Sequence, residues 1–254
     1  MTIFRVSLVA AAALALASAA YGAYPGTYAQ LGSLGAIGVT TDNGNTSVSR
    51  GATSVVVNGQ YGIPTLITTG TQLGLSHDRS LLVLQSMNQK HSSFVVLSTR
   101  DLRVTQTISL HGSFAFDALS PNGQTLYLIE HRSADLQHYV VRAYDLATHT
   151  LRPGRIADKA QKSWVMEGWP TSRVATNDGR WVYTLYTNPG GFPFVHALDT
   201  VRGVAHCVGM AWEGSQNPLY HYRLGINGSR LLVMRGDGSV YRSINRTTWA
   251  VSLR

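Results

Sequence analysis

The sequence has little charge, few lysines and a single cysteine, and each shortage narrows what the chain can be. Charged residues make up 13% of the 254 positions, roughly half of the usual ~25%. Cys207 is the only cysteine, so the chain forms no internal disulfide and must be held by burial alone. The net charge is +8 and comes almost wholly from arginines. They are scattered without a basic run, so nucleic-acid binding is not predicted.

Motifs for catalysis and metal binding are also missing. The sequence contains no G-x-S-x-G nucleophile turn. Its nine histidines show neither H-x-x-x-H nor H-x-H spacing. We therefore predict no catalytic residue, no cofactor and no metal site. Cys207, His196 and His206 lie in apolar strand-like segments, where packing explains them better than chemistry.

The first 22 residues have the features of a signal peptide. A basic head, Met1 to Arg5, precedes the apolar run Val6 to Ala20, and Ala20-Tyr21-Gly22 fits a cleavage site. An uncleaved anchor is the alternative. No later segment reaches the ~20 apolar residues of a spanning helix, so the mature chain should have no integral membrane span. We expect a secreted or cell-envelope protein.

What the sequence does contain is a repeat. Each copy has four short apolar strands, and a polar turn follows the first strand. The turns begin near Asp78, Asn122, Asp178 and Asn227, at steps of 44, 56 and 49 residues. Propeller blades of four strands typically take ~40–50 residues. The pattern predicts an all-β fold, a β-propeller of four-stranded antiparallel blades. The four clear copies span 71–110, 114–158, 171–210 and 220–254.

The region before the first clear copy fits the repeat less well. Residues 27–70 predict a partial blade, in which Ile37 to Thr41, the turn at Asp42 and Ser54 to Val57 form a hairpin. The domain would then span 23–254, with about five blades or an incomplete ring. A β-sandwich is the rival fold, but a sandwich need not repeat at this long period.

Three segments resemble a known family. They are Phe116 to Ile129, Gly168 to Tyr186, and Pro193 to Thr200. Together they are similar to uncharacterised secreted bacterial propeller proteins, common in actinobacteria, of the YVTN and WD-repeat-like kind. The likeness covers roughly residues 55 to 254. It implies the fold and export, and it brings no catalytic residue.

Candidate binding residues lie in the loops between second and third strands and in the links between blades, which share the rim called the top. The densest ionisable cluster is Glu130, His131 and Arg132, which could be an acid/base or metal pair or a solvated loop. A second set could bind a partner or plug the gaps between blades. It comprises Trp164, Glu167, Trp169 and Trp212. Asp145 and Asp199 each end a third strand and should cap the following turn.

The leading functional hypothesis is a non-catalytic exported binding module that uses this loop-rich top rim, with a protein or a cell-envelope polymer as partner. The alternative is a propeller hydrolase or lactonase with a site at the central channel. Such a site should draw on the loop positions of several blades. Those positions hold Gln85, Glu130, Tyr186 and Arg235, a set with only one carboxylate. Enzyme activity is therefore disfavoured but left open.

Overall fold

The structure, a computed structural model of the chain, describes residues 23–24, 27–31, 35–66, 69–87, 90–158 and 164–253. The predicted signal segment 1–22 lies outside the described residues. The described part consists of β-strands and one short 3-10 segment, η2 (Asn217–His221). It contains no helix that is long and apolar enough to cross a membrane. The all-β prediction is confirmed.

Most strands belong to five antiparallel sheets that follow one another along the chain, here called blades 1 to 5. Blade 1 contains β2 (Thr27–Gln30), β3 (Ala36–Asp42), β4 (Asn45–Arg50) and β5 (Thr53–Asn58). Blade 2 contains β8 (Leu81–Met87), β9 (His91–Ser98) and β10 (Val104–His111). Blade 3 contains β11 (Phe114–Leu119), β12 (Thr125–His131), β13 (His138–Asp145) and β14 (Thr150–Leu151), with β15 (Met166–Glu167) also paired to β13. Blade 4 contains β16 (Pro170–Ala175), β17 (Trp181–Tyr186), β18 (Phe194–Asp199) and β19 (Val204–Gly209). Blade 5 contains β20 (Arg223–Asn227), β21 (Arg230–Met234), β22 (Val240–Asn245) and β23 (Val251–Leu253).

Blade 1 is more complete than the sequence suggested. The turn at Asn43 and Gly44 is present, with φ of 48° and 81°, but it joins β3 to β4 and not to the strand near Val56. The hairpin prediction missed β4, whose sequence NTSVSR has a single large apolar residue, Val48. Residues 63–66 do not belong to this blade. They form β6 (Ile63–Leu66), which pairs with β1 (Ala23–Tyr24) and β7 (Thr71–Gln72) in a small separate sheet.

The innermost position of blade 2 is held by an irregular segment. Leu75 bridges Leu82 of β8, and the Val83 amide donates to the Gly74 carbonyl at 2.8 Å. Gly74 has a φ of +88°, and a Cβ added there would lie 2.6 Å from the Val83 carbonyl oxygen. The positive φ and the close approach need glycine at this position.

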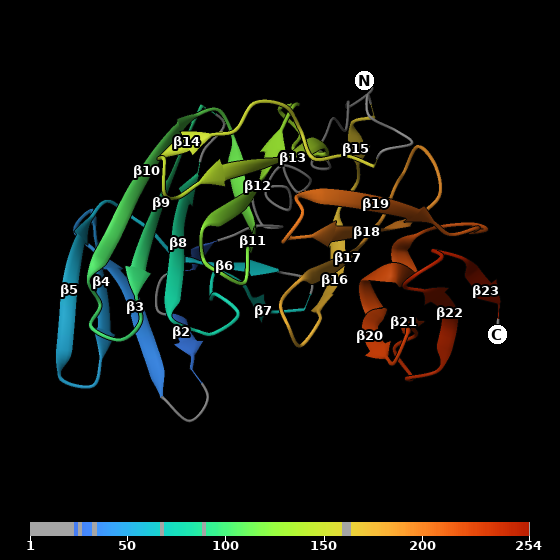
Figure 1. Cartoon of the computed structure of the whole chain (residues 1–254), viewed down its shortest axis with the longest axis horizontal. Coiled ribbons are helices and arrows are strands. Elements are labelled where there is room, and N and C mark those ends of the chain that lie inside the picture. The colour runs from blue at the N-terminus through green and yellow to red at the C-terminus, as the bar shows by residue number, and fades with distance from the viewer. Residues whose placement is uncertain are drawn as a thin grey trace, which may run out of the picture.

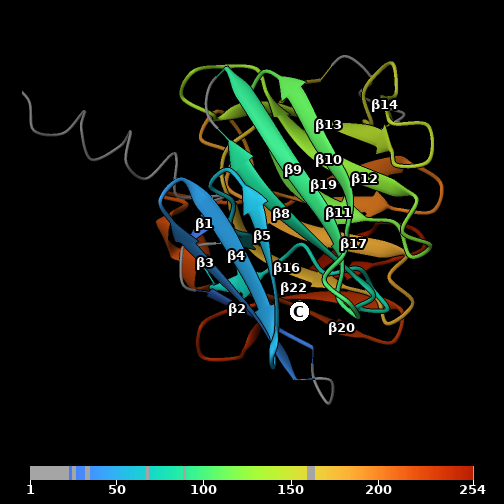
Figure 2. The same cartoon turned by 90° about the vertical axis from the view of Figure 1, so that its left-hand side faces the viewer.

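The five blades form an arc, with blade 1 and blade 5 at its two ends (Figure 1), and Figure 2 views the arc from the blade 1 end. Each pair of neighbouring blades encloses one hydrophobic cluster, which gives four clusters in the described part of the chain. None of the four joins blade 5 to blade 1. The terminal strands also lie in different sheets, since β1 pairs with β6 and β23 pairs with β22. The described strands therefore make an open arc.

The inner blades have strands with continuous apolar runs, because both faces of these blades are buried against a neighbouring blade. Leu82 and Leu84 of β8 pack toward blade 1, whereas Val83 between them packs toward blade 3. Blade 1, at one end, differs because its outer face is largely polar. Thr40, Ser47 and Ser49 occupy this face, where they are half-buried or exposed. A solvated outer face is typical of the last unit in a repeat array.

Antiparallel order places two kinds of connection at opposite rims. The turns between first and second strands and between third and fourth strands lie at one rim, here called the turn rim. The loops between second and third strands and the links between blades lie at the other rim, the predicted top, which is here called the loop rim. A side-chain motif recurs at the turn rim. In blade 4, the Thr176 hydroxyl donates to Asp178 Oδ1 at 2.5 Å, and the Arg180 amide donates to the same oxygen at 3.0 Å. Ser76 with Asp78, and Ser120 with Asn122, repeat these bonds.

The predicted caps at the ends of third strands are confirmed. Asp145 Oδ1 accepts the amides of Ala147 and Thr148 at 3.0 and 2.9 Å. Asp199 Oδ1 accepts those of Val201 and Arg202, both at 3.0 Å. A side chain that satisfies two turn amides stabilises the tight return of the chain.

Candidate functional site

At the loop rim of blade 3, Glu130 is fully engaged in ion pairs. Its two carboxylate oxygens lie 2.7 Å from Arg132 Nη1 and 2.6 Å from Arg142 Nη1. Glu130 is thus held by two guanidinium groups, and both of its oxygens already accept charge-assisted hydrogen bonds. The arrangement favours a structural role over acid/base chemistry.

His131, beside Glu130, is shielded from solvent. Its Nδ1 lies 2.9 Å from the Leu136 carbonyl oxygen, to which it donates. Burial lowers the pKa of His131 to about 4, so its imidazole is neutral at pH 7. The ring packs edge-on against Tyr139, with centroids 6.4 Å apart. His131 therefore packs within blade 3, against Tyr139.

A chain of aromatic rings continues from Tyr139 across the gap between blades 3 and 4. Tyr139 meets Tyr186 at 5.2 Å, Tyr186 stacks on Phe194 at 5.3 Å, and Trp164 packs edge-on against Phe194 at 5.1 Å. Of the two alternatives for Trp164, the geometry fits the inter-blade plug.

Glu167 and Trp169 lie in the link that enters blade 4. Glu167 Oε2 is 3.9 Å from His138 Nε2, and about a third of its side chain is exposed. Trp169 is half-buried, and its amide is held at 3.0 Å by the Thr187 hydroxyl. Gly168 before it has a φ of +114°, and a Cβ there would lie 1.8 Å from the Thr187 carbonyl oxygen. The link is thus fixed by its backbone.

Trp212 belongs to a different group, at the loop rim between blades 4 and 5. Its ring packs edge-on against Tyr222 at 5.7 Å and Tyr241 at 5.1 Å, and its Nε1 donates to the Ser215 carbonyl at 3.0 Å. Two guanidinium groups lie over the Tyr241 ring, those of Arg242 at 3.9 Å and Arg235 at 5.0 Å. Arginine and aromatic side chains therefore gather at one place.

Gln216 ties the two loops of this region together. Its Oε1 accepts the Asn188 amide at 2.7 Å, and its Nε2 donates to the carbonyls of Asn188 and Gly191, both at 2.8 Å. Phe192 in the same loop is 59% exposed, and Tyr220 is 36% exposed. We define the aromatic–arginine surface as six residues. They are Phe192, Trp212, Tyr220, Arg235, Tyr241 and Arg242.

The sequence predicted only Trp212 of this surface. Tyr241 and Arg242 lie within a strand, where the alternating pattern gave no reason to treat them as ligand-binding residues. A bulge in the pairing of β21 with β22 separates the partners of Val233 and Met234. Such a bulge re-aims side chains at the end of a strand, and single-sequence patterns do not reveal it.

The irregular segment 72–77 and the inner strands of blades 3 and 4 line a pocket of about 170 Å³. Asp117 and Arg173 lie in its wall, and Arg173 donates to both the carboxylate and the backbone carbonyl of Asp117. Both side chains are buried, and Arg173 Nε also donates to Thr184 Oγ1 at 2.9 Å. This ion pair joins blade 3 to blade 4, so Asp117 has a structural role.

His196 and Cys207 are neighbours on β18 and β19, with Nδ1 and Sγ 3.5 Å apart. Burial lowers the pKa of His196 to about 4 and raises the pKa of Cys207 to about 12. At neutral pH the pair is a thiol beside a neutral imidazole, which is not an activated nucleophile. Within the described ranges, no three His, Cys, Asp or Glu side chains are grouped closely enough to hold a metal ion.

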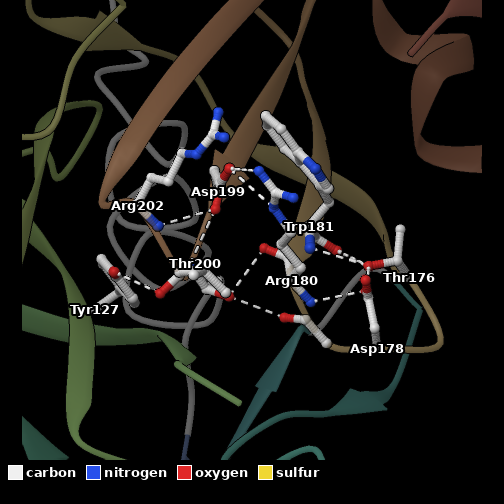
Figure 3. Close-up of polar contacts among 10 residues, drawn as sticks. Tyr127, Thr176, Asp178, Arg180, Trp181, Asp199, Thr200 and Arg202 are labelled. Carbon is white, nitrogen blue, oxygen red and sulfur yellow. Dashed lines mark hydrogen bonds and ion pairs between the residues drawn. The ribbon is translucent and has the colours of Figure 1, made fainter. Parts of the chain in front are cut away.

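The turn rim of blade 4 is held by the contacts in Figure 3. Arg180 Nε and Nη2 donate to Asp199 Oδ2 at 3.1 and 2.9 Å. The Thr200 hydroxyl lies 2.9 Å from the carbonyl oxygens of Gly179 and Arg180. From blade 3, the Tyr127 hydroxyl donates to the Thr200 carbonyl at 2.8 Å. Blades 3 and 4 are thus linked at the turn rim as well as by the ion pair of Asp117 and Arg173.

Neither a protein-family model nor a curated protein sequence matches this chain. Solved structures do. The β-propeller domain of Cps50 (Swd1) from Myceliophteria thermophila matches with a TM-score of 0.53 and 12% identity, over 91% of this chain and 71% of that one. A putative 6-phosphogluconolactonase from Bacteroides uniformis matches with a TM-score of 0.49 and 16% identity, over 92% and 70%. TolB from Acinetobacter baumannii matches with a TM-score of 0.38 and 13% identity, over 82% and 53%.

The first of these likenesses shows the β-propeller fold, and identities this low show nothing beyond the fold. A propeller fold does not by itself imply a function, so function must be argued from the side chains.

Proposed function

We propose that this protein is a non-catalytic binding module that recognises a carboxylate-bearing polysaccharide through the aromatic–arginine surface. One observation carries the proposal, namely the placement of Arg242 and Arg235 over the Tyr241 ring at 3.9 and 5.0 Å. Arg242 Nη1 donates to the Tyr241 carbonyl and Arg235 Nη1 to the Ser239 hydroxyl, and the other N–H groups of the two guanidinium groups can pair with carboxylates.

Apolar and electrostatic features support the same ligand. Phe192 and Tyr220 are exposed aromatic residues in the loops of this region, and sugar rings present flat C–H faces that pack on aromatic rings. Residues 210–253 contain five arginines but only two acidic residues, Glu213 and Asp237. Because Gln216 ties the two loops together, the surface is ordered before binding, which lowers the entropic cost of association.

Export is part of the proposal. If residues 1–22 direct the chain out of the cytoplasm, the surface meets the polymers of the cell envelope. The loop rim is then the binding face, as the sequence suggested, but the residues that bind lie mainly in the last blade.

The test is binding of the mature chain to polygalacturonate, with neutral dextran as the negative probe, measured by calorimetry. We expect binding of polygalacturonate that weakens as salt is added, because ionic contacts are screened. The Arg242→Gln variant should bind about tenfold more weakly, since one charge-assisted pair is worth about 1.4 kcal/mol or more.

The matched control is Arg202→Gln, which removes one charge from an exposed position near the turn rim. It should bind like the wild type. Equal weakening by both variants would mean that only net charge matters, and the proposal would then be wrong. Binding of dextran as tight as that of polygalacturonate would also contradict it.

A further inference from the structure

A second hollow lies on the opposite rim, between blades 4 and 5. It has a volume of about 650 Å³ and opens to solvent. One wall is the β16–β17 turn, with Thr176, Asn177 and Asp178. The other wall is made by the ends of blade 5, with Gly228 and Arg246. Volumes of this order are typical of small-molecule sites.

Arg246 is fixed in place by two hydrogen bonds. Its Nε donates to the Tyr183 hydroxyl at 2.9 Å, and its Nη1 donates to the Gly228 carbonyl at 2.8 Å. The guanidinium also lies over the Tyr183 ring, 5.6 Å from its centroid. Among the described residues, Nη2 has no hydrogen-bond partner. A rigid guanidinium thus brings one unused donor group to the hollow.

Asp178 brings an acceptor to the facing wall. Its Oδ1 is used by the turn, which takes the Thr176 hydroxyl and the Arg180 amide. Its Oδ2 makes no hydrogen bond to any described residue. Asn177 beside it is exposed, and its amide can both donate and accept. Figure 3 shows Asp178 and Thr176 at the turn, next to Trp181.

Between these polar groups the lining is apolar, with Val174 and Ile226 half-buried. Tyr183, which holds Arg246, belongs to an aromatic group behind the lining: it stacks on Trp181 at 6.1 Å, and Trp181 meets Trp249 at 5.3 Å. His206 completes the group, 4.6 Å from the Trp249 centroid.

From this arrangement we infer that the hollow is a binding site for a short neutral saccharide, separate from the aromatic–arginine surface. Arg246 can only donate, and Asp178 can only accept. Their opposite charges lie on facing walls, so the site favours neither a simple anion nor a simple cation. Vicinal hydroxyl groups donate and accept at once, and their sugar ring offers a C–H face to Val174 and Ile226.

The experiment titrates the mature chain with a panel of neutral mono- and disaccharides, namely glucose, galactose, N-acetylglucosamine and their β-1,4-linked dimers. Tryptophan fluorescence reports binding, because the Trp181 amide donates to the Thr176 hydroxyl in the turn that contains Asp178. At least one sugar should bind with a Kd below about 10 mM. If no sugar in the panel binds below this concentration, the inference is overturned.

The Asp178→Asn variant isolates the unused oxygen. It keeps the turn, since Asn122 makes the same bonds in blade 3. We expect binding about tenfold weaker, the loss for one charge-assisted hydrogen bond. The matched control is Asp78→Asn, the same change in the same turn of blade 2, outside the lining of the hollow. Asp78→Asn should bind sugar like the wild type, and equal loss in both variants would overturn the inference.

Two further probes separate this site from other ligands. Inorganic phosphate and glycine test whether Arg246 and Asp178 recognise an anion or a zwitterion. Competition of either probe with the sugar would show that the site is built for ions, against the inference. Arg242→Gln should leave sugar binding unchanged and Asp178→Asn should leave polygalacturonate binding unchanged, so the two sites can fail independently.

Discussion

Arg173 in β16 donates to both the side chain and the backbone carbonyl of Asp117 in β11, and these two hydrogen bonds help to join blades 3 and 4 in the wall of the pocket of about 170 Å³. The side chains are 7% and 2% exposed, so neither charge can be compensated by water. The contact is structural, and it gives the pocket wall its polar part.

Removal of one partner should leave a buried charge without its counterion. We expect Arg173→Met to lower the free energy of unfolding by about 3–5 kcal/mol, measured by urea denaturation. The pair of the exposed Arg152 and the half-buried Asp145 is the control, and Arg152→Gln should cost about 0–1 kcal/mol. A double variant, Asp117→Leu with Arg173→Met, should lose less than the sum of the two single losses. Additive losses would contradict direct coupling.

The open arc predicts unequal roles for two adjacent leucines of blade 5. Leu231 pairs with Ile226 and is buried against blade 4, whereas Leu232 points to the outer face and is half-buried. Leu231→Ala should cost about 2–5 kcal/mol, as for other buried leucines, and Leu232→Ala about 1 kcal/mol or less. In a closed ring, Leu232 would also pack against a blade. Similar losses for the two variants would therefore indicate closure.

Strands buried on both faces were the part of the fold most visible in the sequence. Leu82 to Leu84 and Leu126 to Ile129 are continuous apolar runs because each strand packs on two blades. The spacing of the polar turns between them revealed the repeat. Strand β4 was missed because it belongs to an end blade with a solvated face, where the pattern NTSVSR does not differ from a loop.

The site was less predictable, because its contacts join residues far apart in the chain. Arg246 meets Tyr183 across 63 positions, and Arg173 meets Asp117 across 56. Neither pair has a local spacing that reveals it. The loop rim was placed correctly from the turn pattern, but whether a loop tryptophan packs or stays exposed depends on the neighbouring blade. Trp164 finds Phe194 there, and nothing in its local sequence indicates this.

The free energy of unfolding should fall as the pH is lowered, over a pH range set by the buried His196. His196 has a pKa lowered from 6.5 to about 4 by burial. Between these values the unfolded chain binds a proton that the folded chain does not, so the free energy of unfolding falls as the pH drops from 6.5 to 4. In His196→Gln, the loss between pH 7 and pH 4.5 should shrink by on the order of 2 kcal/mol.

His131, with the same direction of shift, gives the comparison. Its variant His131→Gln should also flatten the curve between pH 7 and pH 4.5. The carboxylates act at lower pH, because hydrogen bonds from Arg152 and turn amides lower the pKa of Asp145 to about 2. A curve for His196→Gln that keeps the full wild-type slope above pH 4.5 would contradict the assignment to His196.

Gly168, in the link into blade 4, should tolerate no side chain. Its φ of +114° disfavours other residues, and an added Cβ would lie 1.8 Å from the Thr187 carbonyl oxygen, so backbone would have to move. We expect Gly168→Ala to cost about 3 kcal/mol or more in urea denaturation. Gly154 is the control, with a φ of +79° and nothing within 4 Å. Gly154→Ala should cost only about 1 kcal/mol, the strain of positive φ alone. Equal costs would mean that the close approach of Gly168 to Thr187 does not hold the link in place.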